Sequence, residues 1–197
     1  MSDPSTSEED AESDDTLMHL VAKGDERAFR ILVERHQGMV IGTVARMIGG
    51  AEAEDIAQKV FLNIWKSAPR WRPEARFTTW LLTITRRLVF NESRRRIRTR
   101  ISPQSSADEF LLSETPDTSP GPDSQLLDRE LHIAIEKALG ELPERERLAV
   151  VLRRYEKMPY DEIALVLGIS VPAVKSLLFR ARSTLKEKLA PYLQDHN

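Results

Sequence analysis

The sequence predicts an all-α protein made of two small helical domains. Outside its low-complexity stretches, apolar residues recur at the three- and four-residue spacing of amphipathic helices, and no run alternates as a strand would. A proline- and serine-rich segment, residues 101–126, separates the two helical stretches and is typical of a flexible linker. With 197 residues and 41% hydrophobic content, the chain can bury a core in each domain.

An acidic tail is expected at residues 1–15, which hold seven acids and no base. We expect this stretch to be disordered because it is polar and low in complexity. The whole chain has a formal charge of -2, so the remainder is basic, as in many nucleic-acid-binding proteins. No basic n-region or long apolar run is present, which predicts a cytoplasmic protein without membrane insertion.

The first domain, residues 16–100, is expected to contain four helices. Gly24 and Gly49 stop two of them, and Pro69 and Pro73 interrupt the loop before the last. The expected helices are 16–23, 26–47, 53–67 and 76–98. In the third of these, Leu62 points away from the apolar face into a polar patch, which indicates either a protein-binding surface or an ordinary exposed leucine. The other patch residues are Asp55, Gln58 and Lys59.

The expected helix 76–98 carries two stripes. The core stripe consists of Phe77, Trp80, Leu81, Ile84 and Leu88. The opposite side combines arginines, which suit a phosphate backbone, with a phenylalanine on which an unstacked base can lie. The candidate DNA-binding residues there are Arg76, Arg86, Arg87, Phe90, Asn91 and Arg94. An arginine run follows from 94 to 100, and the basic, aromatic loop 67–76 predicts either a pocket for a flipped base or a surface loop with a docked tryptophan.

The second domain, residues 127–190, is expected to contain a helix-turn-helix, followed by a C-terminal tail at 191–197. The expected helices are 125–139, 143–157, 160–167 and 171–190. Between the last two, Gly168 permits a tight turn, Ser170 is a good N-cap, and Pro172 suits the first helical turn.

The last helix has the pattern of a DNA recognition helix. Val174, Leu178 and Ala181 belong to its core stripe, whereas Phe179 lies in a polar and cationic sector on another side. Such a sector can read base edges and neutralise phosphates in a major groove, although Phe179 packing on a neighbouring helix or subunit is the alternative. The candidate residues are Pro172, Lys175, Ser176, Phe179, Arg180 and Arg182.

Several chemistries are not expected from this chain. It has no cysteine, and its four histidines show no metal-ligand spacing, so we expect neither a metal nor another cofactor. Without a phosphate-binding glycine loop or a nucleophile elbow, an enzymatic function is not predicted either.

Four segments together resemble the bacterial sigma-70 family, specifically its extracytoplasmic-function (ECF, group IV) class. They are AEDIAQKVFLNIWKSA, FTTWLLTITRRLVFNESRRR, the proline-rich linker, and LPERERLAVVLRRYEKMPYDEIALVLGISVPAVKSLLFRARSTLKEKL. The resemblance implies a region 2 domain at 16–100 and a region 4 helix-turn-helix domain at 127–190. It departs from the usual pattern at Lys59, Asn91, Pro172 and Leu177.

The resemblance implies a sigma factor that is monomeric when free and acts with core RNA polymerase and promoter DNA. The patch of Asp55, Gln58 and Leu62 would bind the polymerase, and the loop 67–76 with Arg86, Arg87, Phe90 and Asn91 would read the minus-ten element. Lys175, Ser176, Phe179 and Arg180 would read the minus-35 element. An anti-sigma factor is a further implied partner. The alternatives are a dimeric helix-turn-helix regulator that works without polymerase, and a helical adaptor that binds only protein.

Overall fold

The computed structural model describes residues 12–101 and 122–194, and every regular element within these ranges is a helix. The first half contains α1 (Asp14–Val21), α2 (Glu26–Ile48), α3 (Ala53–Ser67), the 3₁₀ helix η1 (Ala68–Arg70) and α4 (Phe77–Ile101). The second half contains α5 (Pro122–Gly140), α6 (Glu144–Arg154), α7 (Tyr160–Leu167) and α8 (Val171–Gln194). The predicted all-α fold class is confirmed.

Helix α1 begins inside the segment that was expected to be a disordered tail. Ser13 caps it by accepting a hydrogen bond from the backbone N–H of Thr16 at 3.2 Å. Asp14 then pairs with Arg35 at 2.5 Å and with the His36 ring at 2.9 Å. The expected end of the tail at residue 15 is therefore wrong, because a helix begins at Asp14 and this acid anchors it to α2.

Two other boundaries also differ from the expectation. Helix α5 already begins at Pro122, and α8 continues through Pro191 to Gln194, so the predicted tail 191–197 starts within a helix. One proline removes a single intrahelical donor, which a packed helix can tolerate near its end. Residues 1–11 of the predicted tail and 102–121 of the predicted linker lie outside the described residues.

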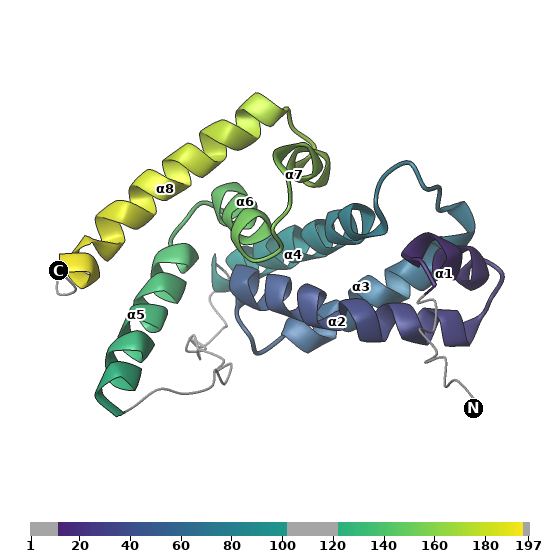
Figure 1. Ribbon diagram of the computed structural model, residues 1–197, viewed down its shortest axis with the longest axis horizontal. Coiled ribbons are helices and arrows are strands. Elements are labelled where there is room, and N and C mark those ends of the chain that lie inside the picture. The colour runs from purple at the N-terminus through teal and green to yellow at the C-terminus, as the bar shows by residue number, and fades with distance from the viewer. Residues whose placement is uncertain (1–11, 102–121, 195–197) are drawn as a thin grey trace, which may run out of the picture.

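The first half is a bundle of α2, α3 and α4 with α1 across one end (Figure 1). Helix α3 contributes a broad buried face, as its pattern predicts, and α1 is anchored by Leu17 and Met18. In the second half, α6, α7 and α8 pack on one another, and α5 lies along α8.

The two halves pack directly against each other, which the two-domain prediction did not include. Helix α7 lies on α4 and α6 lies on α2, and one continuous apolar cluster spans both halves. Polar contacts reinforce this packing: Arg147 donates a 2.7 Å hydrogen bond to the carbonyl oxygen of Met47, and the Arg46 guanidinium lies 3.9 Å above the Tyr155 ring centre. The apolar faces of α6 and α7 therefore complete a core that the first half begins.

Within the described ranges, no single helix has the length and apolarity needed to cross a membrane. Helices α7 and α8 meet those criteria only when taken together, and they form a 95° bend. This bend is the turn of the helix-turn-helix.

Candidate nucleic-acid interface

The turn between α7 and α8 sets the direction of the candidate recognition helix. Gly168 ends α7 in the left-handed conformation, with φ of 65° and ψ of 43°, which costs glycine little. The next residue, Ile169, donates a 3.0 Å hydrogen bond back to the carbonyl oxygen of Ala164 and closes the turn. The local sequence signals therefore produce the predicted corner.

The outward side of α8 is a continuous polar and cationic surface, which we call the α8 face. All six candidate residues are exposed: Pro172, Lys175, Ser176, Phe179, Arg180 and Arg182. The Phe179 side chain is 73% exposed, so the ring lies outside the core, as the helical pattern predicts. On the other side of α8, Val174, Leu177 and Ala181 are buried.

One residue of the α8 face is held by an acid of the same half. The Nε of Arg180 donates to Glu146 at 2.7 Å, and the Glu146 residue is only 7% exposed. This pair holds the Nε end of the guanidinium group in place, while the Arg180 side chain as a whole stays 56% exposed to solvent. Leu177 is buried and belongs to the core, so it leaves this face to its neighbours.

The candidate DNA-binding residues of α4 differ in exposure, because the second half packs on part of this helix. Arg87, Asn91 and Arg94 are exposed, whereas Arg86 is half-buried. Burial lowers the pKa of Arg86, and the positive charge of Arg145 lowers it further. Phe90 is also half-buried and packs against the core, so the expected free aromatic plate is wrong.

The buried side of α4 is rotated relative to the predicted core stripe. Phe77 and Leu81 are buried as expected, but Trp80, Ile84 and Leu88 are only partly buried. Leu82, Thr85 and Val89 are buried instead. The reason is that α4 packs against α2 and α3 on one side and against α7 on another, and a single-stripe analysis assumes one partner surface.

Two arginines of the run at the end of α4, Arg95 and Arg96, are tied to acids. Glu92, a buried residue that the sequence analysis missed, accepts from the Nε of Arg95 at 2.9 and 3.0 Å and lies 3.5 Å from Arg96. The hydrogen bond from Arg95 is the main reason that the pKa of Glu92 is lowered. Arg96 also pairs with Glu52 at 2.8 Å. The expectation that the whole run contacts phosphate is therefore too broad, although Arg94 and Arg98 are exposed.

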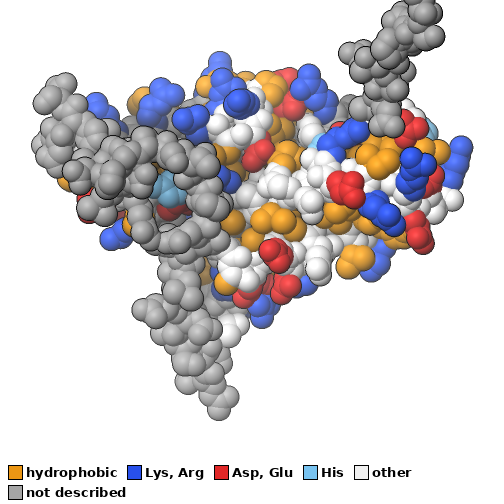
Figure 2. Space-filling model, turned by 60° about the horizontal axis from the view of Figure 1, so that its bottom comes forward, with side chains coloured by type: hydrophobic (Ala, Val, Ile, Leu, Met, Phe, Trp, Pro, Cys, Tyr) orange, Lys and Arg blue, Asp and Glu red, His pale blue; other side chains and the backbone are white. Residues whose placement is uncertain are grey.

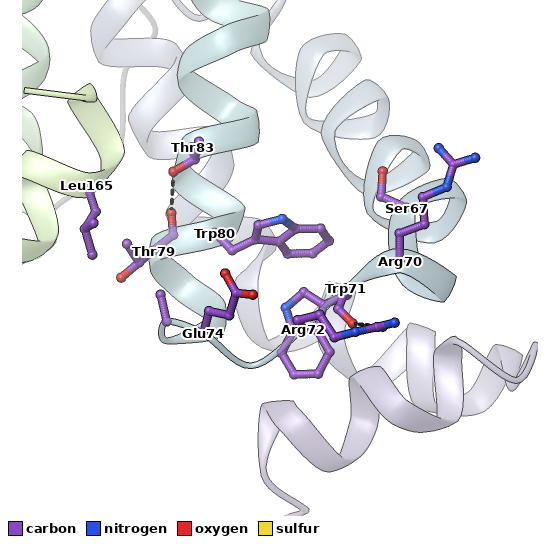
Figure 3. Close-up of a pocket in the computed structure, with 10 residues that line it drawn as sticks. Ser67, Arg70, Trp71, Arg72, Glu74, Thr79, Trp80, Thr83 and Leu165 are labelled. Atoms are coloured by element: carbon purple, nitrogen blue, oxygen red, sulfur yellow. Dashed lines mark hydrogen bonds between the residues drawn. The ribbon is translucent and has the colours of Figure 1, made fainter.

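The loop 67–76 forms an open hollow against α4, with a volume of about 430 Å³. Figure 3 shows Trp71 and Trp80 side by side in this hollow. Residues that line it include Arg70, Trp71, Thr79, Trp80, Thr83 and, from α7, Leu165. Its volume is within the range of about 300–1,000 Å³ that ligand pockets usually have. A docked tryptophan and an open hollow are both present, and the binding of a flipped base in the hollow stays a prediction.

A row of three contacting rings, from His19 of α1 through Trp71 to Trp80, supports the hollow. The His19 and Trp71 rings meet edge to face with 5.5 Å between their centres, and Trp71 lies 6.5 Å from Trp80. Trp71 is only 7% exposed, and its indole Nε1 has no hydrogen-bond partner among the described residues. No sequence pattern predicts the His19 contact, because the two rings come from elements that are distant in the chain.

The candidate polymerase-binding patch lies on α3. Asp55, Gln58, Lys59 and Leu62 are all exposed, and Leu62 has 55% of its side chain in solvent. The buried face of α3 packs on α2 and α4, so the patch is on the outer side of the bundle.

Figure 2 shows Lys and Arg side chains along the upper edge of the presented face, with apolar side chains and some acids between them. Among the described residues, no group of three or more histidines and acids could hold a metal ion.

Each half of the chain matches the model of a known protein family. The family model for Sigma-70 region 2 matches residues 32–99, and the model for Sigma-70, region 4 matches residues 132–185. The RNA polymerase sigma-H factor of Pseudomonas aeruginosa is 31% identical over 192 residues, which cover 93% of this chain and 97% of that protein. The ECF RNA polymerase sigma-E factor of Escherichia coli is 29% identical over 192 residues, covering 92% and 97%.

Solved structures show the same architecture. CnrH in complex with the cytosolic domain of CnrY is similar over 92% of this chain and 99% of that chain, with a TM-score of 0.64 and 27% identity. The sigma factor RpoE of Bartonella quintana, solved with the anti-sigma factor NepR, shares the fold over 82% and 96%, with a TM-score of 0.67 and 22% identity. The chain therefore belongs to the sigma-70 family and is an RNA polymerase sigma factor of the extracytoplasmic-function group.

Proposed function

We propose that this sigma factor uses three separate surfaces to direct initiation. The α3 patch binds core RNA polymerase, the α8 face reads the minus-35 element, and the hollow with the exposed side of α4 reads and holds open the minus-ten element. The observation that carries this proposal is the α8 face, where an exposed phenylalanine lies among Lys175, Arg180 and Arg182. Water is a poor environment for that ring, and a thymine methyl in the major groove is a good one.

The minus-ten assignment is supported by the chemistry around the hollow. Trp80, which is only partly buried, offers aromatic surface for an unstacked base, and the buried Trp71 supports it from below at 6.5 Å between ring centres. Arg87 and Arg94 lie exposed on α4, where they can neutralise the phosphates of the same strand. In this proposal, Phe90 acts through packing and does not stack on a base.

The α3 patch is proposed as the polymerase surface because it combines one apolar residue with a polar rim. An exposed leucine surrounded by Asp55, Gln58 and Lys59 has the composition of a small protein interface. We further propose that the factor performs no bond chemistry, works in the cytoplasm, and has an anti-sigma factor as a regulatory partner.

Transcription with purified core polymerase on genomic fragments tests this proposal. The wild-type factor is expected to give defined start sites, and Leu62→Ala is expected to weaken co-purification with core polymerase. Phe179→Ala should lower initiation from a mapped promoter, whereas Lys186→Ala, a matched exposed change further along α8, should have a smaller effect. A factor that does not associate with core polymerase, or that binds duplex DNA tightly as a homodimer, would contradict the proposal and favour a dimeric regulator.

A further inference from the structure

Glu146 is a buried acid of α6 that holds a residue of the α8 face. Its side chain is 10% exposed and lies in the first turn of α6, where the helix N-terminus stabilises a negative charge. Its carboxylate accepts a hydrogen bond from the Arg180 Nε at 2.7 Å, and it has no other ion-pair partner within residues 12–101 and 122–194. Because a buried charge without a partner is costly, this pair is a fixed part of the folded second half.

The pair leaves the outer end of the Arg180 side chain available. Glu146 occupies the Nε of the guanidinium group, so the two terminal nitrogens carry the remaining donors. The backbone beneath them is also held, since the next residue, Ala181, is fully buried in a cluster with Leu139 and Leu142. Arg180 therefore presents a fork of two nitrogens from a fixed position on α8.

The charge of the pair distinguishes Arg180 from the other cations of the α8 face. Lys175 and Arg182 are exposed and have no ion-pair partner in the described part of the chain, so each keeps its full positive charge for a phosphate. The negative charge of Glu146 offsets that of Arg180. A phosphate attracts net positive charge, whereas the neutral edge of guanine offers O6 and N7 to two well-directed hydrogen bonds from one arginine. The pair is therefore better suited to a guanine than to a phosphate.

We infer that Glu146 is a positioning residue that sets promoter specificity, because it holds Arg180 as the reader of one guanine in the minus-35 element. The inference rests on the proposed minus-35 function of the α8 face. A free arginine loses rotamer freedom when it docks on a base, and an arginine that is already held loses less. The buried acid therefore strengthens the contact with guanine while it stays inside the domain.

Binding of the holoenzyme to promoters that carry each base at each minus-35 position tests the inference. The wild type should prefer guanine at one position, and Arg180→Lys, which keeps the charge but not the fork, should largely abolish this preference, a change of about 5- to 100-fold. Glu146→Gln keeps the volume and an acceptor oxygen but not the charge, and should lower the same preference about 2- to 10-fold. Glu141→Gln, the matched control, changes an acid that pairs with Lys188 further along α8 and should leave the base preferences unchanged.

Salt dependence provides a second readout with a variant that leaves no buried charge without a partner. Arg180→Gln combined with Glu146→Gln replaces the ion pair by a neutral pair that can still form a hydrogen bond. This double variant should lose the guanine preference, while the slope of its log affinity against log salt concentration stays close to the wild-type slope. An arginine that neutralised a phosphate would instead contribute about 0.9 to this slope.

The outcomes separate the two claims. If no base of the minus-35 element affects binding of the wild-type holoenzyme, the proposed function of the α8 face fails and the inference fails with it. If the element is read but Arg180→Lys changes no guanine preference, or Glu146→Gln retains that preference in full, only the inference is overturned. A loss of affinity in Glu146→Gln that is equal for every base would show a structural acid, and a double variant whose slope falls by about 0.9 with its base preference intact would show a phosphate contact. Either result would overturn the inference as well.

Discussion

Phe179 contributes little to the packing of the folded chain, and its proposed role is in DNA binding. Its ring is 73% exposed, while Val174, Leu177 and Ala181 on the same helix supply the buried contacts. The folded chain therefore gains little from this side chain. Burial of an aromatic side chain against a partner contributes about 1.5–3 kcal/mol, so the ring is most valuable when DNA covers it.

Phe179→Ala is predicted to leave the free energy of unfolding within about 0.5 kcal/mol of the wild-type value, because an exposed side chain is removed. Promoter binding by the holoenzyme should weaken about 5- to 30-fold, the equivalent of about 1–2 kcal/mol of lost contact. Urea unfolding and promoter titration measure the two quantities. Unchanged promoter affinity, or a large loss of stability, would show that the ring packs on protein instead.

Glu92→Gln is predicted to destabilise the fold by about 1–2 kcal/mol, because Arg95 and Arg96 lose a charged acceptor. Since the pKa of Glu92 is lowered in the folded state, its contribution is present above the unfolded pKa and is lost as the pH falls through the folded pKa. The difference in unfolding free energy from wild type should therefore be smaller at pH 3 than at pH 7. Glu187→Gln, at an exposed site on α8, is the control and should change little at either pH.

At the scale of the element, the helix-turn-helix was predicted far better than α4. Helix α7 has the predicted bounds and α8 begins at the predicted residue, because the signals at Gly168 and Ser170 act within a few residues. Helix α4 forms where it was predicted, but the face that it buries differs from the predicted one. Its neighbours on both sides are set by distant parts of the chain, and helical spacing alone carries no information about them.

Gly168→Ala is predicted to destabilise the factor by about 1–2 kcal/mol, because alanine is strained in the left-handed conformation at φ 65°. The space around the site is not the problem, since the nearest atom to the new β-carbon would be at 3.6 Å. Gly38→Ala, inside helix α2 with no atom within 4 Å, is the matched control and should stabilise by about 0.5–1 kcal/mol. Thermal unfolding of both variants checks the opposite signs.

At the scale of the whole molecule, the packing of one half on the other is what the sequence did not predict. The hydrogen bond from Thr43 to Glu156, at 3.3 Å, joins residues 113 positions apart. Glu156 lies in the bend after α6 and Thr43 lies in α2, and both residue types are common at solvated positions, so nothing local marks them as contacts. The exposure of the α3 patch and of the α8 face could be predicted because each lies on one helix, whereas the covering of α4 by the other half could not.

Glu156→Gln is predicted to stabilise the packed halves at neutral pH, because burial raises the pKa of Glu156 more than the Thr43 hydrogen bond and Arg46 lower it. The folded state then binds the proton more tightly, so this group costs stability as the pH rises above its unfolded pKa. The gain should be about 0.5 kcal/mol at pH 7, since the site is partly solvated, and should vanish towards pH 4. Unfolding across this pH range measures it, and a gain that grows towards low pH would contradict the assignment.

Permanganate probing of promoter thymines tests the central claim most directly. The reagent attacks unpaired thymines, and we predict reactive thymines in the minus-ten element only when this chain and core polymerase are both present. Factor alone and core alone should leave the duplex unreactive. Thymines that stay protected in the full mixture on a promoter that the holoenzyme binds, or that become reactive with the factor alone, would contradict the account.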